Sequence, residues 1–181
     1  MYGMVNKAVE EMVCARHGEA MWEAVKQRAG VEEEVFISNE AYPDALTYRL
    51  VAAVSELTGA SAPEVLEQFG EHWVLKTAQE GYGELLDAGG LSLPEFLANL
   101  PNFHARVSMI FPRLLPPRFR VTDVKPGSLH LHYYTQRAGL APFVVGLLKG
   151  LGVRFGTPVR SIMLIASREQ GADHDTFLVE W

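Results

Sequence analysis

A group of prolines, Pro112 and Pro116-Pro117, divides the chain into two parts with different hydrophobic patterns. Before the prolines, apolar residues recur at the three- and four-residue spacing of amphipathic helices. After them, short segments alternate between apolar and polar residues as strands do, and one apolar helix is expected over 141–149. The expected strands cover 118–123, 129–137, 159–167 and 176–181. This order predicts an α+β fold in which a helical part precedes a β-β-α-β-β unit.

Several helix boundaries can be predicted from capping residues. Asp44 is a suitable N-cap for a helix that Gly59 would end. Ser61-Ala62-Pro63-Glu64 has the pattern of a capping box with proline in the first turn. Pro101 is expected to break one helix, and Asn102 to begin the next, which runs to about residue 111.

Composition restricts the partners and the compartment. Of 181 residues, 48% are hydrophobic and 21% are charged, which is typical of one globular domain. The net charge of −6 argues against nucleic acid and, less strongly, against an anionic membrane surface. Cys14 is the one cysteine, so no internal disulfide is expected. Without a signal peptide pattern or a long apolar run, a cytoplasmic location is expected.

The segment 129–137 carries polar groups on the strand face that should point inward. Alternation places Leu129, Leu131, Tyr133, Thr135 and Arg137 on one face. Three hydrogen-bond donors in a row on a core face need acceptors, and a ligand with carboxylates would supply them. The alternative is that the arginine reaches the rim of the fold and pairs with an aspartate or glutamate.

Two histidine patterns suggest metal binding. His104 shares a helical face with Val107, Ser108 and Phe111, so it is either a core residue or a metal ligand in an apolar pocket, as in haem proteins. His130-x-His132 has a spacing compatible with zinc, but no third and fourth ligands stand nearby in the sequence. The simpler interpretation of this pair is two exposed histidines on a strand. No hydrolase nucleophile motif is present.

The chain resembles the H-NOX family, the haem-nitric oxide/oxygen binding domains related to the haem domain of soluble guanylate cyclase. The family's Tyr-x-Ser-x-Arg motif is matched by Tyr133-Tyr134-Thr135-Gln136-Arg137, with threonine in place of serine. Threonine keeps the hydroxyl group, so its bonding capacity is retained. NLPNFHARV resembles the helix that carries the iron ligand, with His104 in that position. MYGMVNKA, GYGELL and GLAPFVVGLLKGLG extend the resemblance over essentially the whole chain.

The resemblance implies a fold and a cofactor site. It implies one H-NOX domain over 1–181, with a helical subdomain over about 1–60 packed on a haem-binding part over about 61–181 that contains a four-stranded antiparallel sheet. Haem b would be buried between them, with its iron bound by His104. Tyr133, Thr135 and Arg137 would hold the propionates, and Pro117 would pack on the haem and distort it.

The resemblance also implies a function, which is gas sensing without catalysis. Members that bind O₂ carry a distal tyrosine, and Phe143 stands in the matching region here, so tight NO binding, CO binding and weak or absent O₂ binding are expected. Trp73 is expected to fill space over the haem. Signalling would follow a change at the His104–iron bond and a subdomain shift. The partner would be a separate histidine kinase, diguanylate cyclase or chemotaxis-type receptor.

Three alternatives remain open at this stage. The first is an O₂-binding haem sensor in which the indole N–H of Trp73 donates to the ligand. The second is a peroxidase-like haem enzyme, although no distal acid-base pair is evident. The third is a carrier of another carboxylated apolar ligand, in which His104 is only a core residue.

Overall fold

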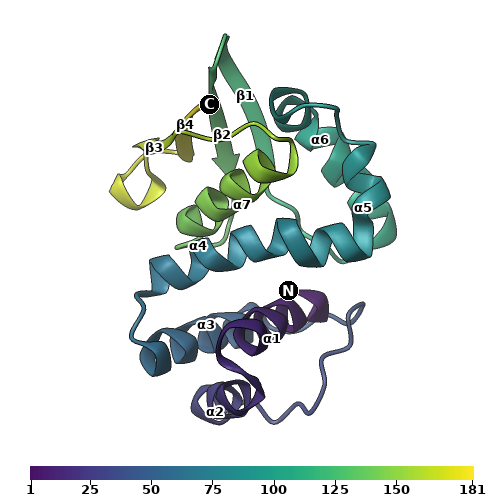
Figure 1. Cartoon of the computed structure of the whole chain (residues 1–181), viewed down its shortest axis with the longest axis vertical. Helices are drawn as coiled ribbons and strands as arrows, with labels where there is room; N and C mark the ends of the chain where they lie inside the picture. Colours follow the sequence, from purple (N-terminus) through teal and green to yellow (C-terminus); the bar gives the residue numbers. More distant parts are fainter.

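A long helical rod crosses the middle of the molecule and separates two groups of elements (Figure 1). The computed structural model describes all 181 residues. The rod consists of α4, a π-helical turn η1 and the start of α5, which turns away after a kink at Tyr82. Three helices lie on one side of the rod, and the sheet with α6 and α7 lies on the other. The helices are α1 (Gly3–His17), α2 (Glu19–Ala29), α3 (Asp44–Thr58), α4 (Ala62–His72), η1 (Trp73–Ala78), α5 (Gln79–Asp87), α6 (Leu93–Ile110), α7 (Ala141–Arg154) and the short 3₁₀ helix η2 (Arg168–Gln170).

Two hydrophobic cores lie on the two sides of the rod. The first is built from α1, α2 and α3, and α4 covers it with Val65, Leu66 and Phe69. The second joins the rod to α6, α7 and the sheet, and η1 contributes Val74 and Ala78 to it. The rod therefore supplies apolar side chains to both cores, and each core gains buried area from it.

The start of α4 follows the predicted capping box. The hydroxyl oxygen of Ser61 accepts from the backbone N–H of Glu64 at 3.4 Å, and the Glu64 carboxylate accepts from the backbone N–H of Ser61 at 2.8 Å. Helix α5 runs through most of the glycine-rich segment 81–90 and ends at Asp87, with a kink at Tyr82 (φ −145°, ψ 28°).

Helix α6 corrects the prediction that Pro101 separates two helices. It is continuous from Leu93 to Ile110 with Pro101 inside it. The proline lacks only one backbone donor, and its ring lies on the exposed side of the helix. Asn102 is not a cap, since its side-chain amide donates to Asn99 within the helix at 2.8 Å.

The four strands form one antiparallel sheet in the order β1-β2-β4-β3. The predicted β-β-α-β-β order is confirmed, and one face of the sheet packs into the second core. Opposite Leu131 of β2 stand Val121 of β1 and Phe177 of β4. The strands are β1 (Arg118–Lys125), β2 (Ser128–Tyr134), β3 (Ser161–Ala166) and β4 (Asp175–Glu180).

Helix α7 approaches α4 closely because glycines line their contact. A Cβ atom at Gly146 would lie 1.9 Å from the backbone oxygen of Glu67, and one at Gly70 would lie 2.2 Å from that of Phe143. Both distances are shorter than any van der Waals contact. The backbones of α4 and α7 therefore meet at a separation that only glycine permits.

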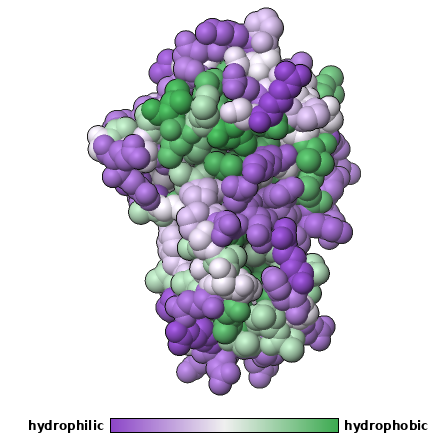
Figure 2. Space-filling view, turned by 60° about the vertical axis from the view of Figure 1, so that its left-hand side comes forward, coloured by the Kyte–Doolittle hydropathy of each residue, from purple (hydrophilic) through white to green (hydrophobic).

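Hydrophobic side chains gather on the surface at the height of the sheet, while the helical end carries a more mixed surface (Figure 2). No helix combines the length and the apolar character needed to cross a bilayer. The most exposed large apolar residues in the part with the sheet are Leu91, Met109, Ile110, Leu115, Val124, Val153, Met163, Leu164 and Ile165.

Candidate functional site

An apolar cavity of ≈ 300 Å³ lies between α6, α7, the sheet, the helical rod and the helices α1 and α3. Of its 37 lining residues, 31 are hydrophobic, so a ligand that fills it must present a mostly apolar surface. All the residues that the sequence singles out for the site lie in its wall: Trp73, His104, Pro117, Tyr133, Thr135, Arg137 and Phe143.

His104 lies in this wall on α6. Its ring is stacked on Phe119 of β1, with centroids 5.5 Å apart and planes inclined by 13°, and its Nδ1 atom is buried without a hydrogen-bond partner. Burial lowers the pKa of His104 below its ordinary value, and the nearby carbonyl of Leu100 acts in the opposite direction. The imidazole is therefore neutral at pH 7, which is the form that binds metals.

Tyr133, Thr135 and Arg137 lie where β2 ends. Tyr133 is buried on the inner face of β2, and burial raises the pKa of its phenol. The strand ends at Tyr134, so the other two residues are in the segment after it, which corrects the expectation that the strand extends to Arg137. The hydroxyl of Thr135 accepts from the backbone N–H of Arg137 at 3.1 Å, which fixes this segment.

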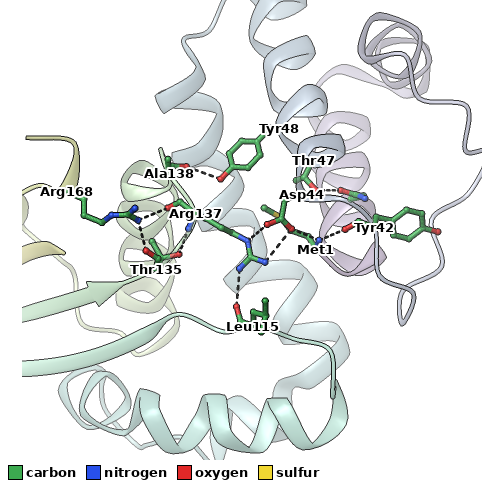
Figure 3. Close-up of polar contacts among 11 residues, drawn as sticks. Met1, Tyr42, Asp44, Thr47, Tyr48, Leu115, Thr135, Arg137, Ala138 and Arg168 are labelled. Carbon is green, nitrogen blue, oxygen red and sulfur yellow. Dashed lines mark hydrogen bonds and ion pairs between the residues drawn. The ribbon is translucent and has the colours of Figure 1, made fainter. Parts of the chain in front are cut away.

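The Arg137 guanidinium joins the two sides of the molecule (Figure 3). Its Nε donates to Asp44 Oδ2 at 2.8 Å and one terminal nitrogen contacts Oδ1 at 3.4 Å, while the other donates to the Leu115 carbonyl at 3.0 Å. An arginine side chain has five N–H donors, so these three contacts leave two for a further acceptor. The ion pair with an aspartate, one of the two alternatives that the sequence leaves open for this arginine, is present in the structure.

Asp44 is not the N-cap that the sequence suggested. Pro43 occupies that position, and the Asp44 carboxylate instead binds Arg137 and the Met1 amino group, the latter at 2.6 Å. Burial acts to raise the pKa of Asp44, but the hydrogen bonds and positive charges of these two partners outweigh it. The net effect lowers its pKa below the ordinary value. Asp44 is thus a charged link between α3 and the segment after β2.

The apolar end of the cavity contains Phe143 of α7 and Trp73 of η1. Both rings contact Phe69 of α4, with centroid distances of 5.1 Å and 6.2 Å respectively. Two nearby hydroxyls in the wall are already engaged, since Thr47 donates to Asn6 at 2.6 Å and Tyr48 to the Ala138 carbonyl at 2.9 Å.

Tyr82 is a wall residue that the sequence analysis did not single out. Its ring packs against Phe111 at the end of α6, with centroids 5.9 Å apart, and burial raises the pKa of its phenol. Its position four residues after Ala78, on the side of the rod that lines the cavity, is a signal that could have identified it.

These features fit a haem group. The apolar interior of the cavity suits the faces of a porphyrin. The neutral imidazole in its wall suits an iron ion, and the Arg137 cation at its rim suits the propionate groups. His104 is the residue that could hold the iron. Tyr133, Thr135 and Arg137 are the residues that could hold the carboxylates.

Comparisons with known proteins agree with this chemistry. A family model described as Haem-NO-binding matches residues 2–162. Soluble guanylate cyclase gcy-35 of Caenorhabditis elegans is 30% identical over 188 residues, which cover 99% of this chain and 26% of that protein. Gcy-32 of the same organism is 31% identical over 157 residues, covering 85% and 23%. The chain thus spans about a quarter of the length of these relatives.

Solved structures share the fold. An H-NOX protein from Shewanella oneidensis in the Fe(II)NO ligation state has a TM-score of 0.89 at 19% identity, covering 99% of this chain and 98% of that one. The Fe(II) unliganded H-NOX protein from K. algicida has a TM-score of 0.85 at 24% identity, with coverages of 99% and 96%.

Proposed function

The chain belongs to the Haem-NO-binding family, the H-NOX domains, and we propose that it senses nitric oxide through haem b held by His104. H-NOX domains are haem-based gas sensors and not catalytic domains. The choice of NO, the type of haem and the roles of individual residues are parts of the proposal.

One observation carries the proposal, namely the buried neutral imidazole in the wall of an apolar cavity. A buried histidine without a ligand function usually pairs its ring nitrogens firmly, yet Nδ1 of His104 makes no hydrogen bond of normal geometry, although the Leu100 carbonyl is nearby. Tyr133, Thr135 and Arg137 stand at the same cavity with donors suited to two carboxylates. The haem iron, when bound, supplies the coordination position that a diatomic gas takes.

The apolar side chains around Phe143 favour NO and CO over O₂. A polar O₂ ligand gains stability from a nearby hydrogen-bond donor, whereas NO and CO depend less on one. Phe69 and Phe143 offer no donor, and the hydroxyls of Thr47 and Tyr48 are committed to Asn6 and Ala138. Trp73 carries the one indole N–H in the wall, and it is the basis of the alternative O₂-binding function.

We propose that the signal passes along α6. Its first half is anchored, since Leu93, Phe96, Leu97 and Leu100 are buried in the second core. Its second half, after Pro101, is largely exposed and carries His104. A shift at His104 would therefore move this second half of α6. This local movement would in turn shift the part 61–181 relative to 1–60. A separate signalling protein, such as a histidine kinase, a diguanylate cyclase or a chemotaxis-type receptor, would read the change.

An absorption spectrum of the reduced protein tests the proposal. The Soret band is expected to shift on addition of NO and on addition of CO, and to stay unchanged in air on the timescale before oxidation. Protein that stays colourless after reconstitution with haem would contradict haem binding by these residues. A stable spectral change with O₂ would instead favour the alternative that depends on Trp73.

A further inference from the structure

The outer face of the sheet, away from the cavity, holds a second pair of histidines. Nδ1 of His132 on β2 lies 2.8 Å from Nε2 of His174, which precedes β4. His130, the partner that sequence spacing suggests, contacts Asp123 instead at 3.1 Å. His174 is 42 residues away from His132 in the chain, so no sequence spacing points to it, and only the β2–β4 pairing brings the two together.

The contacts of His132 determine where its proton lies. Its Nε2 is 2.8 Å from the hydroxyl of Thr122, and that hydroxyl donates to the Asp123 carboxylate at 2.9 Å. A hydroxyl has one proton, so Thr122 must accept from His132 Nε2–H. Nδ1 of neutral His132 is therefore an unprotonated nitrogen, and it is this atom that faces His174, with the Thr176 hydroxyl 3.2 Å away.

The contacts of His174 likewise locate one of its protons. Its Nδ1 lies 3.2 Å from the Asp173 carboxylate, which can only accept, so this nitrogen carries the proton. The Tyr134 ring is stacked on the imidazole at 4.0 Å and fixes its plane. When His174 is neutral, its Nε2 is then also unprotonated. In this neutral form two lone pairs face each other at 2.8 Å, an arrangement that is repulsive unless a proton or a metal ion lies between them.

We propose that His132 and His174 form a binding site for a divalent late transition-metal ion, distinct from the haem site. Imidazole nitrogens bind such ions at about 2.0–2.1 Å, so two nitrogens at right angles about one ion are about 2.9 Å apart. That separation matches the square or octahedral geometry of Cu²⁺ and Ni²⁺ better than the tetrahedral geometry of Zn²⁺. Carboxylates that orient the outer nitrogens of ligating histidines are a regular feature of metal sites, and Asp173 stands in that position.

The remaining coordination positions would be filled by water. No group of three or more histidine, cysteine, aspartate or glutamate side chains is arranged around one point, so the protein supplies two ligands. The hydroxyl of Thr176, 3.2 Å from His132 Nδ1, is the nearest further oxygen. His174 is 21% exposed, so an ion can reach the site from solvent.

Titration of the haem-loaded, reduced and CO-saturated protein with Ni²⁺ tests the site by calorimetry and NMR. One equivalent should bind, and the paramagnetic ion should broaden the signals of residues around His132 and His174. His174→Ala should weaken binding at least tenfold, and Asp173→Ala about tenfold or more. His17→Ala, at an exposed histidine, and His130→Ala are matched controls that should retain the wild-type affinity.

Three results would overturn the proposal. The first is the absence of saturable Ni²⁺ binding. The second is a loss of Ni²⁺ affinity in His17→Ala as large as that in His174→Ala. The third is a set of imidazole ¹⁵N shifts that show a proton shared between the two rings. If His132→Ala does not fold, His174→Ala alone decides, because its side chain lies outside the strands. Haem binding is measured on the same samples by absorption. If the protein does not bind haem, the Ni²⁺ titration still decides whether His132 and His174 bind a metal ion.

Discussion

At the scale of single residues, His104 is the decisive side chain, because the proposed iron site has no other histidine in the cavity wall. His104→Ala should lose the protein ligand to the haem iron and most of the haem at purification. Free imidazole in the buffer should restore the absorption spectrum, since the deletion leaves a space of the same shape. His130→Ala, on the outer face of the sheet, is the control. An unchanged ferrous spectrum in His104→Ala would show that another residue binds the iron.

A second residue-scale prediction concerns Phe143, which stands at the apolar end of the cavity beside Phe69. Phe143→Tyr adds one hydroxyl donor with little change in volume. O₂ affinity should rise from undetectable to measurable, because the donor can bond to a polar ligand. Absorption spectra in O₂-saturated buffer measure the change. Trp73→Phe is the companion variant: if wild-type protein already binds O₂ and this variant does not, the indole is the donor and the proposed NO preference is wrong.

At the scale of elements, the contact between α4 and α7 depends on glycine. Gly146→Ala places a methyl group 1.9 Å from the backbone oxygen of Glu67, where neither helix can yield without moving its backbone. The free energy of unfolding should fall by about 2 kcal/mol or more. Gly81→Ala in α5 is the matched control, since nothing lies within 4 Å of its added carbon, and it should stabilise by about 0.5–1 kcal/mol. Urea unfolding of both variants measures the difference, and equal stabilities would contradict it.

The sequence predicted helix starts and strands correctly where residues that are close together in the chain determine the local structure. The capping box at Ser61 and the alternation in 129–134 depend on neighbouring residues, and both predictions are confirmed. The prediction failed at Pro101, because burial of Leu97 and Leu100 on the same helix outweighs one missing hydrogen bond. It also failed at Asp44, whose partner Arg137 is 93 residues away. The seven predicted site residues share one cavity, but their haem contacts stay predictions.

At the scale of the whole molecule, the Asp44–Arg137 ion pair links the two sides of the helical rod, and it should make stability depend on pH. The folded pKa of Asp44 is lowered, so the pair stabilises the fold above the ordinary value of 3.8. This stabilisation should be lost as the pH falls below that value, through the folded pKa. The unfolding midpoint of the wild type should therefore decrease more steeply with acidification than that of Asp44→Asn.

Arg137→Gln serves as the partner variant in a double-mutant cycle. The double variant should lose less stability than the sum of the two single losses, because both changes remove the Asp44–Arg137 pair, while only one of them removes the Met1 contact and only the other the Leu115 contact. Additive losses of stability would show that the two side chains act independently. Parallel pH profiles for the wild type and Asp44→Asn would also contradict the prediction.

The π-helical turn η1 helps to keep cavity-lining side chains on the same side of the helix before and after it. Val74, Ala78, Tyr82 and Leu86 all line the cavity, and they are spaced four residues apart. In an ordinary α-helix each such step would rotate the side chain by about 40°, so the last would point well away from the first. The wider turn absorbs part of this rotation. The extra residue of this turn therefore lets side chains on both sides of Trp73–Ala78 face one cavity, which a regular helix of the same length would not do.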